Sequence, residues 1–162
     1  MLILNNPGNI RRSVDHFVGE LVPSVDTDFK QFSSMAYGYR AMFLILKNYG
    51  KKGVNTLAKI IERYAPRNEN ETAAYIDYVS KMGLHKNPND RLDLEDKQTA
   101  FQLVSAMSYF ENGRQPVPDE IEQGWKLLHK DNKVKKTETA FLSLVLLLAV
   151  TFYVFKKERK WK

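Results

Sequence analysis

The stretch SSMAYGYRAMFLILKNYG, residues 33–50, determines the fold class, because its large apolar residues recur with the period of an α-helix. A serine stands just before the periodic segment, where its side chain can cap the first turn. Spacings of three and four place five residues on one face: Tyr39, Met42, Phe43, Leu46 and Tyr49. The stretch therefore predicts a helix with one buried face.

The same period continues through most of the remaining chain. NTLAKIIERYAP, residues 55–66, predicts a helix that ends at Pro66, and NETAAYIDYVSKMG, residues 70–83, predicts one that ends at Gly83. Two further helices are expected over residues 94–110 and 118–129. Before residue 34 there is room only for short extended pieces, so the fold class is mainly α with a small β element near the N-terminus.

Residues 140–155, AFLSLVLLLAVTFYVF, form an apolar run without a charge, proline or glycine. The run is apolar on all sides, and the basic stretches KVKK and KKERKWK flank it. A buried core helix is the ordinary alternative, although such a helix usually has a polar stripe. We therefore predict a transmembrane helix at 138–157, between a basic linker at 130–137 and a basic tail at 158–162, after a globular domain at 1–129.

Composition excludes several kinds of chemistry. The chain has no cysteine, so disulfides, thiolate metal sites and cysteine nucleophiles are ruled out. Its three histidines are scattered, and neither a metal nor another cofactor is expected. Much of the net charge of +6 lies in the last seven residues, which carry five cations and one anion. Nucleic-acid packing by this tail is an alternative, but nucleic acid is not expected as a partner because the tail adjoins the apolar run.

Glu111 occupies an unusual position at the end of the helix predicted over 94–110. The buried stripe predicted for that helix consists of Ala100, Leu103, Val104, Met107 and Phe110. Glu111 follows Val104 by seven residues and Met107 by four, which aims a carboxylate at this apolar face. Gly113 is placed to end the helix, so Glu111 would lie where the helix dipole disfavours ionisation. Burial acts in the same direction, so a raised pKa and a role as general acid are predicted. The alternative is a structural pair with an arginine, such as Arg40 or Arg114.

The first 113 residues resemble a family of phage virion proteins, often described only as structural. The shared motifs are NNPGNIR (5–11), FVG (17–19), F..F (29 and 32), GYRAM (38–42), YAPRNENET (64–72), the tyrosine of TAAYIDYV, and ENG (111–113). This chain departs from the family pattern at Phe17 and Tyr64, where tryptophan is usual, and at Arg67, where proline is expected.

The motifs are also similar to those of bacterial cell-wall glucosaminidases of the lysozyme-like superfamily, in which a helix ends at a catalytic glutamate and a loop ending NLFGIK follows. Here the loop comes first, as NNPGNIR, and the helix ending Glu-Asn-Gly comes late. We infer a circularly permuted order of the same parts. The resemblance implies a lysozyme-like fold with Glu111 as the catalytic acid, which would protonate the glycosidic oxygen.

The resemblance also implies substrate-binding residues, and each has an ordinary structural explanation. The asparagine amides of the first motif suit sugar hydroxyls, or they merely stabilise a turn. Glu69 and Asn70 would meet substrate, or cap the following helix. Tyr75 would reach the cleft with its hydroxyl or belong to the core, and Glu20 ranks last among the glutamates. The full predicted binding set is Asn5, Asn6, Asn9, Arg11, Arg40, Glu69, Asn70 and Tyr75.

We therefore expect a virion-associated enzyme of a membrane-containing phage that cleaves peptidoglycan glycan strands during host entry. It would act as a lytic transglycosylase, a muramidase or a glucosaminidase. Its expected partners are the glycan strands and a lipid bilayer. The bilayer would be the viral membrane and, during assembly, the host membrane. Capsid proteins are further candidate partners. The alternative is a catalytically inactive structural or glycan-binding virion protein that links membrane and capsid.

Overall fold

The computed structural model describes residues 4–66, residues 71–130, Leu142 and Leu146. The chain divides into two compact units, Met1–Leu128 and His129–Lys162. In the second unit the described residues are His129, Lys130, Leu142 and Leu146, and the two leucines are helical and exposed. The first unit contains the elements that carry the predicted motifs.

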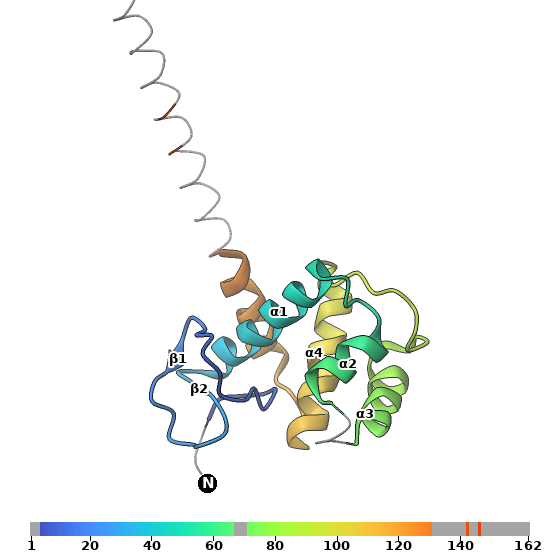
Figure 1. Ribbon diagram of the computed structural model, residues 1–162, viewed down its shortest axis with the longest axis horizontal. Coiled ribbons are helices and arrows are strands. Elements are labelled where there is room, and N and C mark those ends of the chain that lie inside the picture. Colours follow the sequence, from blue (N-terminus) through green and yellow to red (C-terminus); the bar gives the residue numbers. More distant parts are fainter. Residues whose placement is uncertain (1–3, 67–70, 131–141, 143–145, 147–162) are drawn as a thin grey trace, which may run out of the picture. The chain divides into compact units, whose positions relative to one another are not determined.

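The first unit is mainly helical, with a small antiparallel sheet near its start, as the sequence predicts (Figure 1). The two strands are β1 (Glu20–Leu21) and β2 (Gln31–Phe32). The helices are α1 (Met35–Lys51), α2 (Leu57–Tyr64), α3 (Thr72–Tyr78), the π-helix η1 (Val79–Leu84) and α4 (Lys97–Asn112), and residues 118–130 are also helical.

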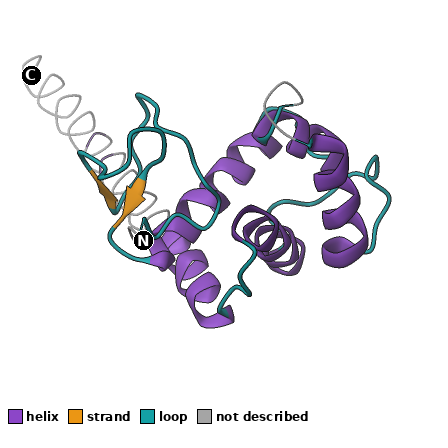
Figure 2. Cartoon of the chain, turned by 90° about the horizontal axis from the view of Figure 1, so that it is seen from below, coloured by secondary structure: helices purple, strands orange, loops and turns teal. Residues whose placement is uncertain are grey.

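Helix α4 runs through the core of the first unit. It contacts η1, α1 and α3, and in Figure 1 it lies among these helices. Figure 2 shows the strands and the long N-terminal loop on one side of the helical part. Leu103, Val104 and Met107 of α4 are completely buried, so truncating any of them to alanine would remove about 2–5 kcal/mol of stability. These residues belong to the apolar stripe predicted from the sequence.

An aromatic cluster joins α1, α4 and the helix over 118–130. The Phe43 ring packs edge-on against Trp125 with centroids 5.1 Å apart, and Phe101 contacts both rings. Gly124 lies directly against the backbone of α1, where an added methyl group would be 2.8 Å from the carbonyl oxygen of Ala36. Because glycine has no side chain, the two helices can approach each other closely at this point.

Several boundaries differ from the predicted ones. The fourth helix begins at Lys97, three residues later than predicted, because Asp96 caps it by accepting a hydrogen bond from the Thr99 amide at 2.8 Å. The third helix ends at Tyr78 and continues as η1. The change of pitch turns Met82 outward, and it is 67% exposed although helical spacing places it in the core.

The predicted transmembrane helix has to be corrected. Within the residues that the structure describes, no helix is both long enough and apolar enough to cross a bilayer. The predicted span, 138–157, lies outside the described residues except for Leu142 and Leu146, as do most of the predicted linker and all of the basic tail. The prediction of a transmembrane helix rests on sequence hydropathy alone. Hydropathy measures how apolar a segment is and does not show what surrounds it.

Candidate functional site at the end of helix α4

Glu111 lies in the last turn of α4, where the sequence places it. The helix ends as Gly113 adopts a left-handed conformation, with φ at 63°, and donates its amide to the carbonyl oxygen of Tyr109 at 2.7 Å. Glu111 is half-buried rather than exposed, unlike its neighbour Asn112. A carboxyl group is therefore held at the edge of the core by the last turn of a helix whose preceding turns are buried.

The N-terminal loop makes direct contact with this carboxyl group. The Asn9 side-chain amide donates to Glu111 Oε2 at 3.0 Å and to the Glu111 backbone carbonyl at 3.0 Å. The Asn112 amide donates in return to the carbonyl oxygen of Pro7 at 2.6 Å. The two motifs NNPGNIR and ENG are thus joined by three hydrogen bonds, although about a hundred residues separate them.

The loop reaches this position because two glycines leave room for it. A methyl group at Gly38, on α1, would collide with the carbonyl oxygen of Asn5 and with the ring of Pro7. A methyl group at Gly8 would collide with the Tyr64 hydroxyl, which donates to the Gly8 carbonyl at 2.5 Å. The GYRAM motif and the tyrosine of YAPRNENET therefore both serve to seat the NNPGNIR loop.

Replacing Gly38 by alanine is expected to push the loop off α1. Overpacking of this kind reduces stability by about 1–3 kcal/mol, and the displacement would also break the Asn9 contact with Glu111. Denaturant unfolding and the ¹⁵N resonance of the Asn9 side-chain amide report the two effects. Ala41→Gly, on the same buried face of α1, is the control for helix propensity; an unchanged Asn9 resonance in Gly38→Ala would contradict the role of Gly38.

Two tyrosines complete the surroundings of Glu111. The Tyr75 hydroxyl donates to the Met107 carbonyl oxygen at 3.4 Å, and it lies close enough to the Glu111 carboxyl group to lower the pKa of that group. Tyr75 itself is 1% exposed and comes from α3. Burial first, and then the nearby Glu111 charge, raise the pKa of both Tyr64 and Tyr75, so both stay neutral hydrogen-bond donors.

Burial raises the pKa of Glu111 above its ordinary value, and the hydrogen bonds from Asn9 and Tyr75 offset only part of that effect. The direction agrees with the sequence prediction. A carboxyl group with a raised pKa keeps its proton to higher pH, and it can donate that proton to a basic oxygen placed against it. A raised pKa is the property that a general acid needs near neutral pH.

The raised pKa makes stability depend on pH in a definite direction. Below the ordinary pKa of 4.5 both the folded and the unfolded chain hold the proton, and the stabilising contribution of the protonated carboxyl is complete. As pH rises through the folded pKa, the contribution is lost. Glu111→Gln has no proton to lose, so it should gain stability relative to wild type between about pH 4 and about pH 7. Urea unfolding at both pH values checks this; a relative loss by the glutamine variant would show that the ionised carboxylate is the stabilised form.

The predicted asparagines divide between the loop itself and the carboxyl group. The Asn5 amide donates to the Phe32 carbonyl, and the Asn6 amide donates to the carbonyls of Ile10 and Lys30, so both hold the loop together. Asn5 and Asn9 also have positive φ, of 50° and 45°, which asparagine tolerates well. The side chains of Asn5 and Asn6 hydrogen-bond to backbone carbonyls and so stabilise the loop, as the alternative explanation expects. The side chain of Asn9 hydrogen-bonds to Glu111 instead.

The predicted arginines lie in different surroundings. Arg11 is exposed, with its guanidinium 5.6 Å from the centre of the Phe29 ring, whereas Arg40 is buried on α1. The pKa of Glu111 is set by burial, Asn9 and Tyr75, and neither Arg40 nor Arg114 contributes to it. Glu69 and Asn70 lie outside the described residues.

Sequence reasoning missed the contributions of Tyr64 and Asn112. In the sequence Tyr64 is only a departure from an expected tryptophan, and Asn112 only the middle letter of ENG. Their only signal in the sequence is that they stand within the motifs YAPRNENET and ENG. No group of three or more side chains that could hold a metal ion occurs within residues 4–66 and 71–130.

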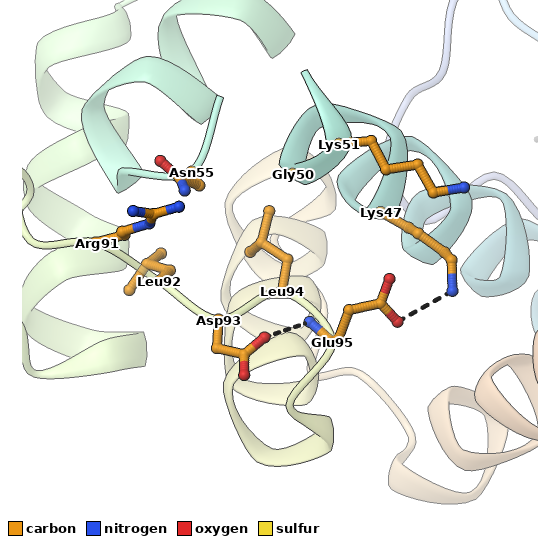
Figure 3. A pocket seen from close by; sticks show the side chains of 9 residues that line it. All are labelled: Lys47, Gly50, Lys51, Asn55, Arg91, Leu92, Asp93, Leu94 and Glu95. Atoms are coloured by element: carbon orange, nitrogen blue, oxygen red, sulfur yellow. Dashed lines mark hydrogen bonds and ion pairs between the residues drawn. The ribbon is translucent and has the colours of Figure 1, made fainter. Parts of the chain in front are cut away.

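A surface hollow of about 520 Å³ lies elsewhere, between the end of α1 and the segment before α4 (Figure 3). The buried Leu92 and Leu94 are among its lining residues, and the ion pair between Lys47 and Glu95, at 3.0 Å, lies at its edge. None of its lining residues belongs to the group around Glu111. The hollow therefore takes no part in the chemistry considered for that glutamate.

The fold and site define a small helical protein whose N-terminal loop hydrogen-bonds to a half-buried carboxyl group at a helix end. The chain belongs to a family of phage proteins. It is 37% identical over 128 residues to Protein P5 of Pseudoalteromonas phage PM2, and the match covers 75% of this chain and 77% of that protein. No family model matches the chain. The predicted kinship with phage proteins is confirmed, and virion association is supported, whereas the lysozyme-like resemblance stays a prediction.

Proposed function

We propose that this chain is a virion-associated enzyme that cleaves the glycan strands of peptidoglycan during host entry, with Glu111 as its general acid. The observation that carries the proposal is the state of that carboxyl group, which is half-buried, raised in pKa and oriented by Asn9 and Tyr75. Membership of a phage protein family supports the setting, since a phage must cross a cell wall to deliver its genome.

The proposed reaction begins with proton transfer from Glu111 to the glycosidic oxygen. The bond from that oxygen to the anomeric carbon breaks as an oxocarbenium-like centre develops, and the leaving sugar takes the proton. Attack on the anomeric carbon by the 6-hydroxyl of the sugar that carries the oxocarbenium centre would return a proton to the Glu111 carboxylate and give a 1,6-anhydro product. Attack by water would give a hydrolysed product instead. The first route needs no second carboxylate.

Asn9 and Tyr75 act in this scheme as positioning residues. Asn9 donates to Glu111 Oε2, which favours the proton on the other carboxyl oxygen. Tyr75 lies near the same carboxyl group in a buried position and lowers its pKa. Both residues would also stabilise the carboxylate that forms after proton transfer.

Digestion of purified sacculi by the full chain tests the proposal. Soluble muropeptides identified by mass spectrometry would support it, and anhydro ends would identify the transglycosylase route. A folded protein that releases nothing would overturn the enzymatic function.

A second candidate function is a structural or glycan-binding virion protein without catalysis. The same hydrogen bonds favour it, because Asn9 and Asn112 tie the N-terminal loop to α4 whether or not a proton moves. This candidate predicts that the chain binds sacculi without cutting them. It also predicts that Glu111→Gln, which keeps an oxygen to accept the Asn9 hydrogen bond, binds sacculi as the wild type does.

A further inference from the structure

Three aromatic residues pack together near the end of α4, and we call Tyr78, Tyr109 and Phe110 the aromatic face. The rings of Tyr78 and Tyr109 are nearly parallel, with centroids 5.7 Å apart and an angle of 10°. The Phe110 ring lies 5.6 Å from that of Tyr78. The face is built by α3 and the last turn of α4, and it immediately precedes Glu111 in the chain.

This face is open to solvent, against the expectation from the sequence. Helical spacing assigns Phe110 to the buried stripe of α4, yet it is 37% exposed, and Tyr78 and Tyr109 are half-buried. One face of the Phe110 ring stacks on Tyr75, with centroids 4.0 Å apart and an angle of 16°. The exposed surface of Phe110 is therefore the part of the ring that does not stack on Tyr75.

Tyr75 joins the aromatic face to the acid. Its ring stacks on Phe110, and its hydroxyl lies close enough to the Glu111 carboxyl group to lower the pKa of that group. Because Tyr75 is buried, it supports the exposed Phe110 ring from the side of the core. A ligand that stacks on Phe110 is therefore connected to the Glu111 carboxyl group through one buried side chain.

Charge helps to decide what such a ligand would be. The charged residues of α3 and η1 are Asp77 and Lys81, which neutralise each other in an ion pair of 2.8 Å. On α4, Lys97 lies at the end away from the face and pairs with Glu122 at 2.8 Å, and Glu111 is proposed to hold its proton. Stacked bases of a nucleic acid would need an excess of cations along their backbone. An electrically balanced aromatic face instead matches an uncharged ligand with an apolar side.

Sugar rings have this character. One side of a pyranose presents C–H groups that pack on an aromatic ring, while hydroxyl and N-acetyl groups around its rim can hydrogen-bond to tyrosine hydroxyls. We propose that Tyr78, Tyr109 and Phe110 form a subsite on which a sugar unit of the glycan strand stacks, with Phe110 connected to the Glu111 carboxyl group through Tyr75. This inference rests on the proposed function and extends it to the side chains that hold the substrate.

Sedimentation with purified sacculi tests the subsite, with the full chain carrying Glu111→Gln so that no substrate is cut. Adding Phe110→Leu keeps apolar bulk against Tyr75 but removes the planar ring, and Tyr109→Ala removes the neighbouring ring. Each change should weaken binding by about tenfold, as loss of one stacked aromatic contact does elsewhere. The matched control is Val14→Ala, at a 93% exposed apolar residue on the N-terminal loop, and it should bind as the parent does.

The outcomes separate this subsite from the proposed chemistry. Equal binding by Phe110→Leu, Tyr109→Ala and their parent, with thermal unfolding confirming that all are folded, would overturn the subsite while leaving cleavage by Glu111 intact. Loss of binding in both variants, with a wild-type chain that cuts nothing, would keep the subsite and overturn the enzyme. Retention on single-stranded DNA rather than on sacculi would overturn the subsite as a sugar-binding surface.

Discussion

Replacing Glu111 by glutamine is expected to lower the rate of muropeptide release from sacculi by about 10²–10⁴-fold, the usual contribution of a positioned general acid. Glutamine has nearly the same shape as protonated glutamate, and its side-chain oxygen can still accept from Asn9 and Tyr75. The amide cannot supply a proton to a glycosidic oxygen, so catalysis should fall while the fold persists. The measurement is an initial rate of soluble muropeptide release at equal concentrations of folded protein.

Glu71→Gln provides the matched control, because Glu71 is an exposed glutamate just before α3. That variant should release muropeptides at the wild-type rate. Equal release by wild type and by folded Glu111→Gln would show that another group is the acid, and Glu69 is then the next carboxyl group to replace. The glutamine change separates chemistry from structure because it preserves the loop contacts.

Replacing Lys30 by alanine should remove about 3–5 kcal/mol from the free energy of unfolding, the usual effect of breaking a buried ion pair. Lys30 is 1% exposed, and its ammonium donates to Glu20 Oε1 at 2.9 Å and to the Asp15 carbonyl at 2.7 Å. The Glu20 side chain is only 7% exposed. The alanine variant would leave that carboxylate buried without its cation, and urea unfolding at about pH 7 measures the loss.

The pH dependence of this pair has the opposite sign to that of Glu111. Although burial alone would raise the pKa of Glu20, hydrogen bonds from Lys30 and the Phe17 amide lower it overall. The stability that the pair contributes is therefore present above the ordinary pKa of 4.5 and is lost as pH falls through the folded value.

Lys47→Ala is the surface control for the Lys30 experiment. The Lys47–Glu95 pair also spans 3.0 Å, but Glu95 is 58% exposed, so its loss should change stability by at most about 1 kcal/mol. Similar losses from the two lysine variants would contradict the view that burial makes the Lys30 pair strong.

Local periodicity is sufficient to predict the helical part of the fold. Tyr39, Met42 and Leu46 share a buried face of α1, and the same spacing marks the core residues of α4. The position of Glu111 follows from this spacing as well. The helix end at Gly113 is readable because a glycine directly past an apolar stripe commonly ends a helix.

The contacts between distant segments cannot be read in this way. Nothing local in NNPGNIR indicates that Asn9 bonds to Glu111 whereas Asn6 bonds to its own loop, since the three asparagines have the same chemistry. The distinction arises from the path that Gly8 and Gly38 allow the loop to take. Lys30 gives no signal, because a lysine side chain usually extends its charged end to solvent.

Two predictions that had to be corrected share a physical cause. Periodicity assigns Phe110 to the core, and hydropathy assigns residues 138–157 to a membrane. Both assume that the apolar character of a residue or segment determines what surrounds it. Phe110 lies where α4 ends and the core stops, so it is exposed despite its apolar ring. The apolar character of a segment is a local property, whereas its burial depends on which other elements pack against it.

The pH–rate profile of glycan release, for wild type beside Asn9→Ala, tests the central claim most directly. If protonated Glu111 is the acid, the wild-type rate should fall as pH rises through the pKa of that carboxyl group. Because the Asn9 hydrogen bond lowers this pKa, removing it should move the falling limb to higher pH. A falling limb at the same pH in both proteins would contradict the assignment of Glu111 as the proton donor.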